Sequence, residues 1–99
     1  MKSESTIKME YNDVIVQANK LDKCVSELQE VTRQLDQVIN DLRAGWEGES
    51  ANLFCSKCDE LYVKIKRSSN DVDKTSDVIR RTARIYRDME LAAIKILQD

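Results

Sequence analysis

The sequence predicts an all-α protein: one antiparallel helix-turn-helix hairpin, with two such hairpins pairing into a four-helix bundle. The 99 residues include no proline, and the only two glycines, Gly45 and Gly48, lie near the middle of the chain. On both sides of them apolar residues recur at alternating steps of three and four, the spacing of a helical seam. Because glycine enters left-handed backbone conformations without a side-chain clash, the chain has one expected point of reversal. We expect a single domain over residues 1–99.

The first helix is expected over residues 11–43, after acidic residues that suit the positive end of the helix dipole. Residues before position 10 are expected to be frayed or extended. Gly45 is expected to end the helix as a left-handed cap, within a turn over residues 44–48. The expected seam consists of Tyr11, Val14, Ala18, Leu21, Val25, Leu28, Thr32, Leu35, Ile39 and Leu42.

The second helix is expected over residues 49–97. Its expected seam is Phe54, Cys58, Leu61, Ile65, Ser68, Val72, Thr75, Ile79, Thr82, Tyr86, Met89, Ala93 and Ile96. Folding the chain at the turn places Ala18 opposite Thr75, and Tyr11 opposite Thr82. The second helix then continues for about four turns beyond the start of the first. We therefore expect a C-terminal overhang without an intrachain partner.

Extra apolar residues flank each seam, so the apolar stripe is wider than a two-stranded coiled coil requires. A wider stripe indicates a second neighbouring hairpin. The residues expected to form the dimer interface are Cys24, Val31, Val38, Val78 and Ile85.

Composition argues against several functional classes. The net charge of -2, with acids and bases interspersed, disfavours nucleic acid as a partner because phosphate binding needs a cationic excess. No apolar run approaches the ~20 residues of a membrane span, so membrane insertion is not expected. The N-terminal residues lack the apolar segment of a cleavable signal peptide. With no histidine, catalysis is not expected, and neither is a cofactor.

Two cysteines, Cys55 and Cys58, form a CxxC motif near the start of the second helix. A thiol-redox or metal-binding protein is one alternative that uses them, but the motif lacks the βαβ setting of thiol oxidoreductases. A zinc site needs further ligands, and Cys24 is expected roughly 15 Å from Cys58 along the bundle. We expect no metal site, and we interpret the thiols as small apolar packing groups.

The central Trp46-Glu47-Gly48 triplet lies between helical heptads in a chain of about one hundred residues. In this combination the sequence resembles the WXG family of small substrates of the type VII, or ESX-like, secretion system. Trp46 and Gly48 are the turn motif of that resemblance. The family also carries a C-terminal export signal, a tyrosine followed four residues later by an acid. Residues that fit this signal and its helical continuation are Tyr86, Glu90, Ala93 and Leu97.

The resemblance implies a small non-enzymatic protein, made in the cytoplasm and secreted, or a targeting partner that accompanies a larger substrate. The implied partners are the type VII export ATPase and a second hairpin, either a second copy or another small helical protein. An LXG-type toxin targeting region is a further implied partner. A basic cluster on the expected overhang is either a solvated face or a surface that steers an acidic partner; it comprises Arg80, Arg81, Arg84 and Arg87. An intracellular coiled-coil scaffold or adaptor is the main alternative.

Overall fold

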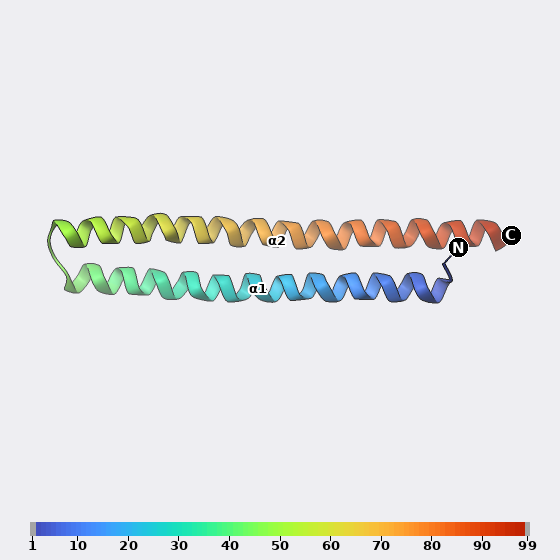
Figure 1. The fold of residues 1–99 in the computed structure, drawn as a ribbon, viewed down its shortest axis with the longest axis horizontal. Coiled ribbons are helices and arrows are strands. Elements are labelled where there is room, and N and C mark those ends of the chain that lie inside the picture. The colour runs from blue at the N-terminus through green and yellow to red at the C-terminus, as the bar shows by residue number, and fades with distance from the viewer. Residues whose placement is uncertain (1, 99) are drawn as a thin grey trace. The chain divides into compact units, whose positions relative to one another are not determined.

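A computed structural model describes residues 2–98, which form two long helices joined by residues 46–48 (Figure 1). Helix α1 runs Glu4–Gly45 and helix α2 runs Glu49–Gln98, and no strand is present among the described residues. The all-α class and the two-helix hairpin are therefore confirmed. A single chain supplies two of the four helices of the expected bundle, so the pairing of two hairpins remains a prediction.

The contacts divide the chain into two compact units. The terminal unit comprises Met1–Asp22 and Asp73–Asp99, and the turn unit comprises Lys23–Val72. Within each unit, a segment of α1 runs antiparallel to a segment of α2 (Figure 1).

Helix α1 begins seven residues earlier than the sequence-based estimate, so the expectation of a frayed N-terminal segment is wrong. Ser3 caps the helix, because its hydroxyl oxygen accepts the Thr6 N–H at 3.1 Å and its carbonyl accepts the Ile7 N–H at 3.1 Å. Glu4 adds an acid to the first turn, where the helix dipole favours negative charge. The extension places Ile7 against α2, with only 3% of the side chain exposed.

The reversal depends on Gly48 and not on Gly45. Gly48 has a φ of 114°, whereas Gly45 is the last residue of α1 and has no positive φ. The expected left-handed cap at Gly45 is therefore wrong. The Trp46 N–H still bonds to the Leu42 carbonyl at 2.8 Å, and the Gly48 carbonyl accepts the Asn52 N–H at 3.0 Å to open α2. Gly48 thus supplies both the left-handed geometry and the first carbonyl of the second helix.

In the turn unit, a thin row of side chains is buried between the two helix segments. Helix α1 contributes Val25, Thr32 and Ile39, and α2 contributes the small residues Ala51, Cys55 and Ser69. The Thr32 hydroxyl donates to the Leu28 carbonyl at 2.7 Å, so this polar residue is satisfied within its own helix. An ion pair between Arg43 and Asp59 links the helices near the turn.

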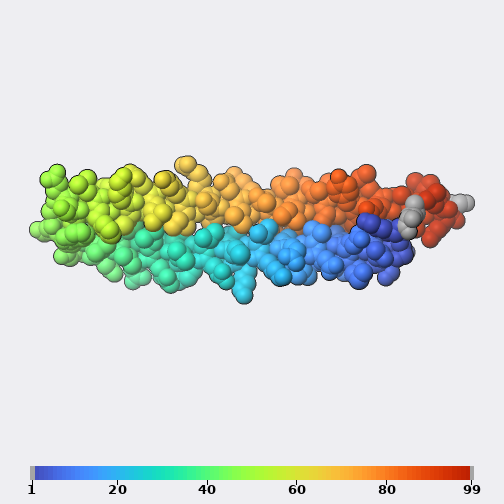
Figure 2. Space-filling view, in the orientation of Figure 1, coloured from blue at the N-terminus to red at the C-terminus, as the bar shows by residue number. Residues whose placement is uncertain are grey.

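In the terminal unit, Ile7 and Ala18 of α1 and Ser76 of α2 are buried between the helix segments. The Ser76 oxygen lies 3.2 Å from the Ala18 carbonyl oxygen, which sets the register one residue from the expected pairing with Thr75. Figure 2 shows the blue N-terminal segment of α1 lying directly against the orange and red segment of α2. The expected four-turn overhang is therefore too long, because the early start of α1 covers one side of α2 as far as Ala93 and Ile94. The end of α2 still extends beyond the start of α1 (Figure 1).

The row of α2 that faces α1 differs from the expected seam. The fully buried positions of α2 are Ala51, Cys55, Ser69 and Ser76, and the last three each lie one residue after an expected seam position. Other expected seam positions are half-buried and remain in the contact row: Cys58, Ile65, Val72 and Ile79. Larger members of the expected seam remain exposed, namely Phe54, Leu61, Tyr86, Met89 and Ile96. The fully buried positions of α2 therefore hold small residues, which permit close approach of the helices, whereas these five larger side chains lie on the surface.

Candidate partner-recognition site

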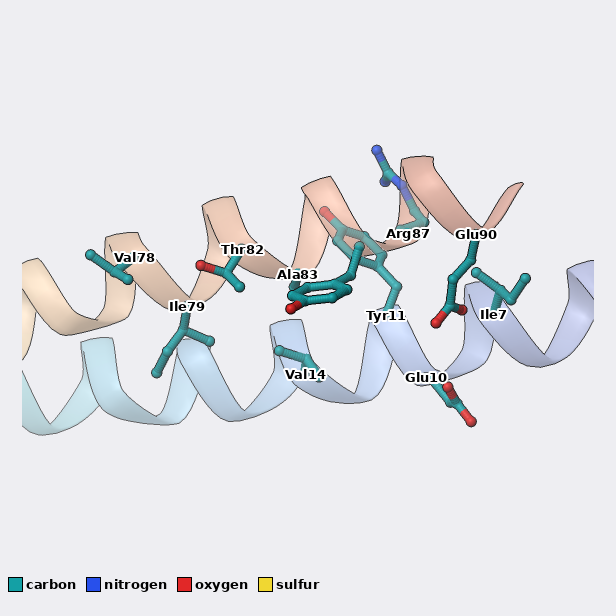
Figure 3. A pocket seen from close by; sticks show the side chains of 11 residues that line it. Ile7, Glu10, Tyr11, Val14, Val78, Ile79, Thr82, Ala83, Arg87 and Glu90 are labelled. Carbon is teal, nitrogen blue, oxygen red and sulfur yellow. The ribbon is translucent and has the colours of Figure 1, made fainter. Parts of the chain in front are cut away.

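The terminal unit has an apolar groove of about 400 Å³ between α1 and α2, here called the terminal groove (Figure 3). Val14 and Ile79 line it from opposite helices, and Ile79 points toward α1 in the close-up view. The full lining is Ile7, Glu10, Tyr11, Val14, Val78, Ile79, Thr82, Ala83, Tyr86, Arg87 and Glu90. Because its wall is mainly apolar and open to solvent, the groove suits an apolar side chain or helix face of a partner.

One edge of the groove is held by a cation–π contact. The guanidinium carbon of Arg87 lies 4.3 Å from the centre of the Tyr11 ring, and Arg87 also pairs with Asp88 at 3.0 Å. These contacts fix the Tyr11 ring at the groove wall. The sequence places Arg87 in a basic cluster, either a solvated face or a surface that steers an acidic partner, and in the structure its guanidinium packs on Tyr11 of the other helix.

The four residues of the proposed export signal, here called the recognition stripe, consist of Tyr86, Glu90, Ala93 and Leu97. Tyr86 is 61% exposed and Leu97 is 69% exposed, and Ala93 is also exposed. Spacings of four, three and four place all of them along one stripe of α2. Tyr86 lines the terminal groove, so its ring is available to a partner that enters the groove.

Glu90 differs from the rest of the stripe because the N-terminal end of α1 reaches it. The Lys2 ammonium donates a hydrogen bond to Glu10 Oε2 at 2.8 Å and lies 3.7 Å from Glu90 Oε1. The hydrogen bond to Glu10, aided by the charges of both carboxylates, raises the pKa of Lys2 above its ordinary value. A second cavity of about 230 Å³ lies beside this contact and is lined by Lys2, Ile7, Glu90, Ala93 and Ile94.

A polar cluster around Ser76 joins the two helices within the terminal unit. The Ser76 hydroxyl donates to Asp22 Oδ1 at 2.7 Å, and Arg80 donates to Ser76 at 2.9 Å and to Asn19 Oδ1 at 2.8 Å. Arg80 also forms an ion pair with Asp22. The hydrogen bonds from Arg80, first, and from Ser76 lower the pKa of Asp22. Arg80 is thus engaged within the chain, while Arg81 and Arg84 are exposed.

The residues expected at a dimer interface lie on the surface of both units. In the turn unit, Cys24, Val31 and Val38 are exposed, and in the terminal unit Val78 and Ile85 are exposed. Val78 also lines the terminal groove.

The Trp46 ring packs on Phe54, with ring centres 5.7 Å apart and planes inclined by 52°. It is 42% exposed. The turn tryptophan is therefore half-buried against the first turns of α2, and one face remains open to solvent.

The three cysteines have different surroundings. Cys24 is exposed, Cys55 is buried, and Cys58 is half-buried, and all three are free thiols. Cys58 was expected to be the buried one, but the one-residue shift of the α2 contact row buries Cys55 instead. No group of three or more potential metal ligands gathers among residues 2–98. Over the same residues, neither helix contains a stretch that is long and apolar enough to cross a bilayer.

Three features of this site were not predicted from the sequence: the Lys2 contact with Glu90, the burial of Ile7 and the Ser76 cluster. Ile7 carried a usable signal, because it lies seven residues before Val14 and four after Ser3, a residue that can cap a helix. The Ser76 cluster had no such signal, because it depends on which edge of the apolar stripe faces α1.

Comparisons with known proteins give one match. The family model described as "WXG100: Proteins of 100 residues with WXG" matches residues 6–91, a range that includes the turn triplet, Tyr86 and Glu90. A search of curated proteins and a search of solved structures found no match. Because the family model spans most of the chain, and the turn has the geometry described above, the protein belongs to the WXG100 family of small type VII secretion substrates.

Proposed function

We propose that this protein is a non-enzymatic substrate or targeting partner of a type VII secretion system, recognised through the recognition stripe and secreted to the outside of the cell. The observation that carries the proposal is the exposure of Tyr86. An aromatic side chain that is 61% exposed on a helix packed along its other side is available for contact with another molecule.

The chemistry of the stripe suits recognition of a helix by a groove. Tyr86 offers a ring and a hydroxyl, Glu90 offers a carboxylate one turn later, and Ala93 and Leu97 continue the same line with small and apolar groups. The family match ends at residue 91, so Ala93 and Leu97 are included because they continue the signal at its helical spacing and lie exposed on the same stripe. The export ATPase is the proposed reader of the stripe.

A second helical hairpin is the proposed partner for the apolar surfaces. It is either a second copy, another small helical protein or an LXG-type toxin targeting region, and it completes a four-helix bundle. Exposed apolar side chains in each unit support this pairing, because they exceed what the narrow contact row between α1 and α2 buries. The proposed contacts are Cys24, Val31 and Val38 in the turn unit, and Val78 and Ile85 in the terminal unit.

In the terminal unit the two proposed surfaces adjoin. Tyr86 and Val78 line the same groove, so a hairpin seated there also contacts the Tyr86 ring. Substitution at Tyr86 is therefore expected to weaken pairing to some degree as well as export. Leu97 does not line the groove, and its substitution separates the two effects.

The test compares secretion of Tyr86→Ala with that of Met89→Ala, a control with the same 61% exposure that lies outside the stripe. We expect Tyr86→Ala to be retained in cells that secrete the wild type and Met89→Ala, with helicity unchanged in both variants. Leu97→Ala is expected to reduce secretion without changing sedimentation. Normal secretion of both stripe variants would contradict the proposal and favour an intracellular coiled-coil scaffold.

A further inference from the structure

The residues at the N-terminal end of α1 partly cover the acidic half of the recognition stripe and leave 39% of the Glu90 side chain exposed. Ile7 is buried beside Ala93 and Ile94 in the lining of the smaller cavity, and Lys2 spans Glu10 on α1 and Glu90 on α2. Tyr86, one turn before Glu90, remains exposed. The two halves of the stripe therefore differ in accessibility. The Tyr86 ring is open to solvent, whereas the Glu90 carboxylate is already paired with Lys2 of the same chain.

We propose that residues 2–7 form a strap over Glu90, with Lys2 as its lock, and that the partner which reads the stripe supplies a cation that replaces Lys2. The inference builds on the proposed function and adds the chemistry of the reader. That reader has an apolar pocket for the Tyr86 ring and, about one helical turn away, a lysine or arginine for Glu90.

The ion pairs that hold the strap are exposed to water, which weakens them. Lys2 is half exposed, and its two ion pairs lie at the surface, where such pairs contribute little to stability. The remaining attachments are the Ser3 cap and the buried Ile7 side chain, both in the first turns of α1, so releasing residues 2–7 opens only the end of that helix.

The charges around Lys2 also favour its displacement from Glu90 by a cation of the partner. The Lys2 ammonium lies 2.8 Å from Glu10 and 3.7 Å from Glu90, so moving Lys2 away leaves two nearby carboxylates without the cation that they share. A partner that pairs with Glu90 relieves this repulsion and leaves Lys2 bound to Glu10. The shorter Lys2–Glu10 contact of 2.8 Å, against 3.7 Å to Glu90, is consistent with Glu90 being the site that is released.

The test measures the accessibility of the Glu90 carboxylate directly. A carbodiimide with glycine ethyl ester converts accessible carboxylates to amides, and mass spectrometry gives the rate at each acid. Lys2→Ala is expected to raise the Glu90 labelling rate at least three-fold, and Ile7→Ala is expected to raise it too. Lys8→Ala is the matched control, because Lys8 pairs with Glu4 at 2.8 Å within α1. Its Glu90 rate is expected to equal that of the wild type.

Secretion of the same variants tests the second half of the inference. If displacement of Lys2 is part of recognition, Lys2→Ala is secreted at least as well as the wild type, and Lys2→Glu, which adds a third acid, also keeps Glu90 accessible. An unchanged Glu90 labelling rate in both Lys2→Ala and Ile7→Ala would overturn the strap. Faster labelling with reduced secretion would overturn the role of displacement. Neither outcome depends on Tyr86→Ala, so failure of the strap and failure of the proposed function are distinguishable.

Discussion

Replacing Gly48 with alanine tests whether the turn geometry is as the structure has it. A Cβ atom added at Gly48 has no heavy atom within 4 Å, so any cost comes from the backbone and none from a clash. A φ of 114° is a conformation that L-residues rarely adopt, and holding alanine there costs about 1–3 kcal/mol. For a chain of 99 residues, each kcal/mol lowers the melting temperature by about 4–8 °C.

Gly45→Ala is the matched control, three residues away in the same segment. Gly45 also has open space around its Cβ position, but it lies in α1 without a positive φ. Alanine there is expected to be neutral or to stabilise by about 0.4–1 kcal/mol, because it restricts the unfolded chain. Urea unfolding followed by circular dichroism gives both free energies of unfolding. Equal effects of the two substitutions, or a greater loss at Gly45, would refute the assignment of the reversal to Gly48.

Three further predictions concern electrostatics, the tryptophan and the thiols. The hydrogen bond from Arg80 lowers the pKa of Asp22 below its ordinary value of 3.8. The ionised Asp22 carboxylate therefore stabilises the folded state at pH values above 3.8. This stabilisation is lost as the pH falls through the folded-state pKa of Asp22. Asp22→Asn should therefore reduce the decrease in the free energy of unfolding measured from pH 5 to 2. Trp46→Ala should cost about 1–2 kcal/mol in urea unfolding, less than for a fully buried ring, because 42% of the side chain is exposed; a loss above 4 kcal/mol would contradict the half-buried position. Under native conditions iodoacetamide should modify Cys24 well before Cys55, as read by peptide mass spectrometry, and equal rates would contradict the buried position of Cys55.

The sequence predicts the all-α hairpin well because its determinants are local. The apolar spacing and the two glycines leave one place for the chain to turn, and Gly48 indeed adopts the left-handed conformation. The start of α1 was missed because the seam was counted from Tyr11, which ignored Ile7 and the capping Ser3. Capping residues are short-range signals, so Ser3 and Ile7 together indicate the earlier start of the helix.

The contact row of α2 was harder to predict. Periodicity locates the centre of a wide apolar stripe, but it does not tell which edge faces the chain's own partner helix. In the structure the small residues Cys55, Ser69 and Ser76 take that edge, since they permit close helix approach. Tyr86 lies on the exposed side of α2 and is proposed to contact another molecule. The Lys2–Glu90 contact follows from the early start of α1 and so could not be derived without it.

Secretion of Tyr86→Ala, measured beside Met89→Ala as the fraction of each protein in the culture medium of a type VII-competent host, tests the central claim most directly. The account predicts loss of Tyr86→Ala from the medium, at unchanged helicity and cellular amount, with Met89→Ala secreted as the wild type is. Equal amounts of the two variants in the medium would contradict it.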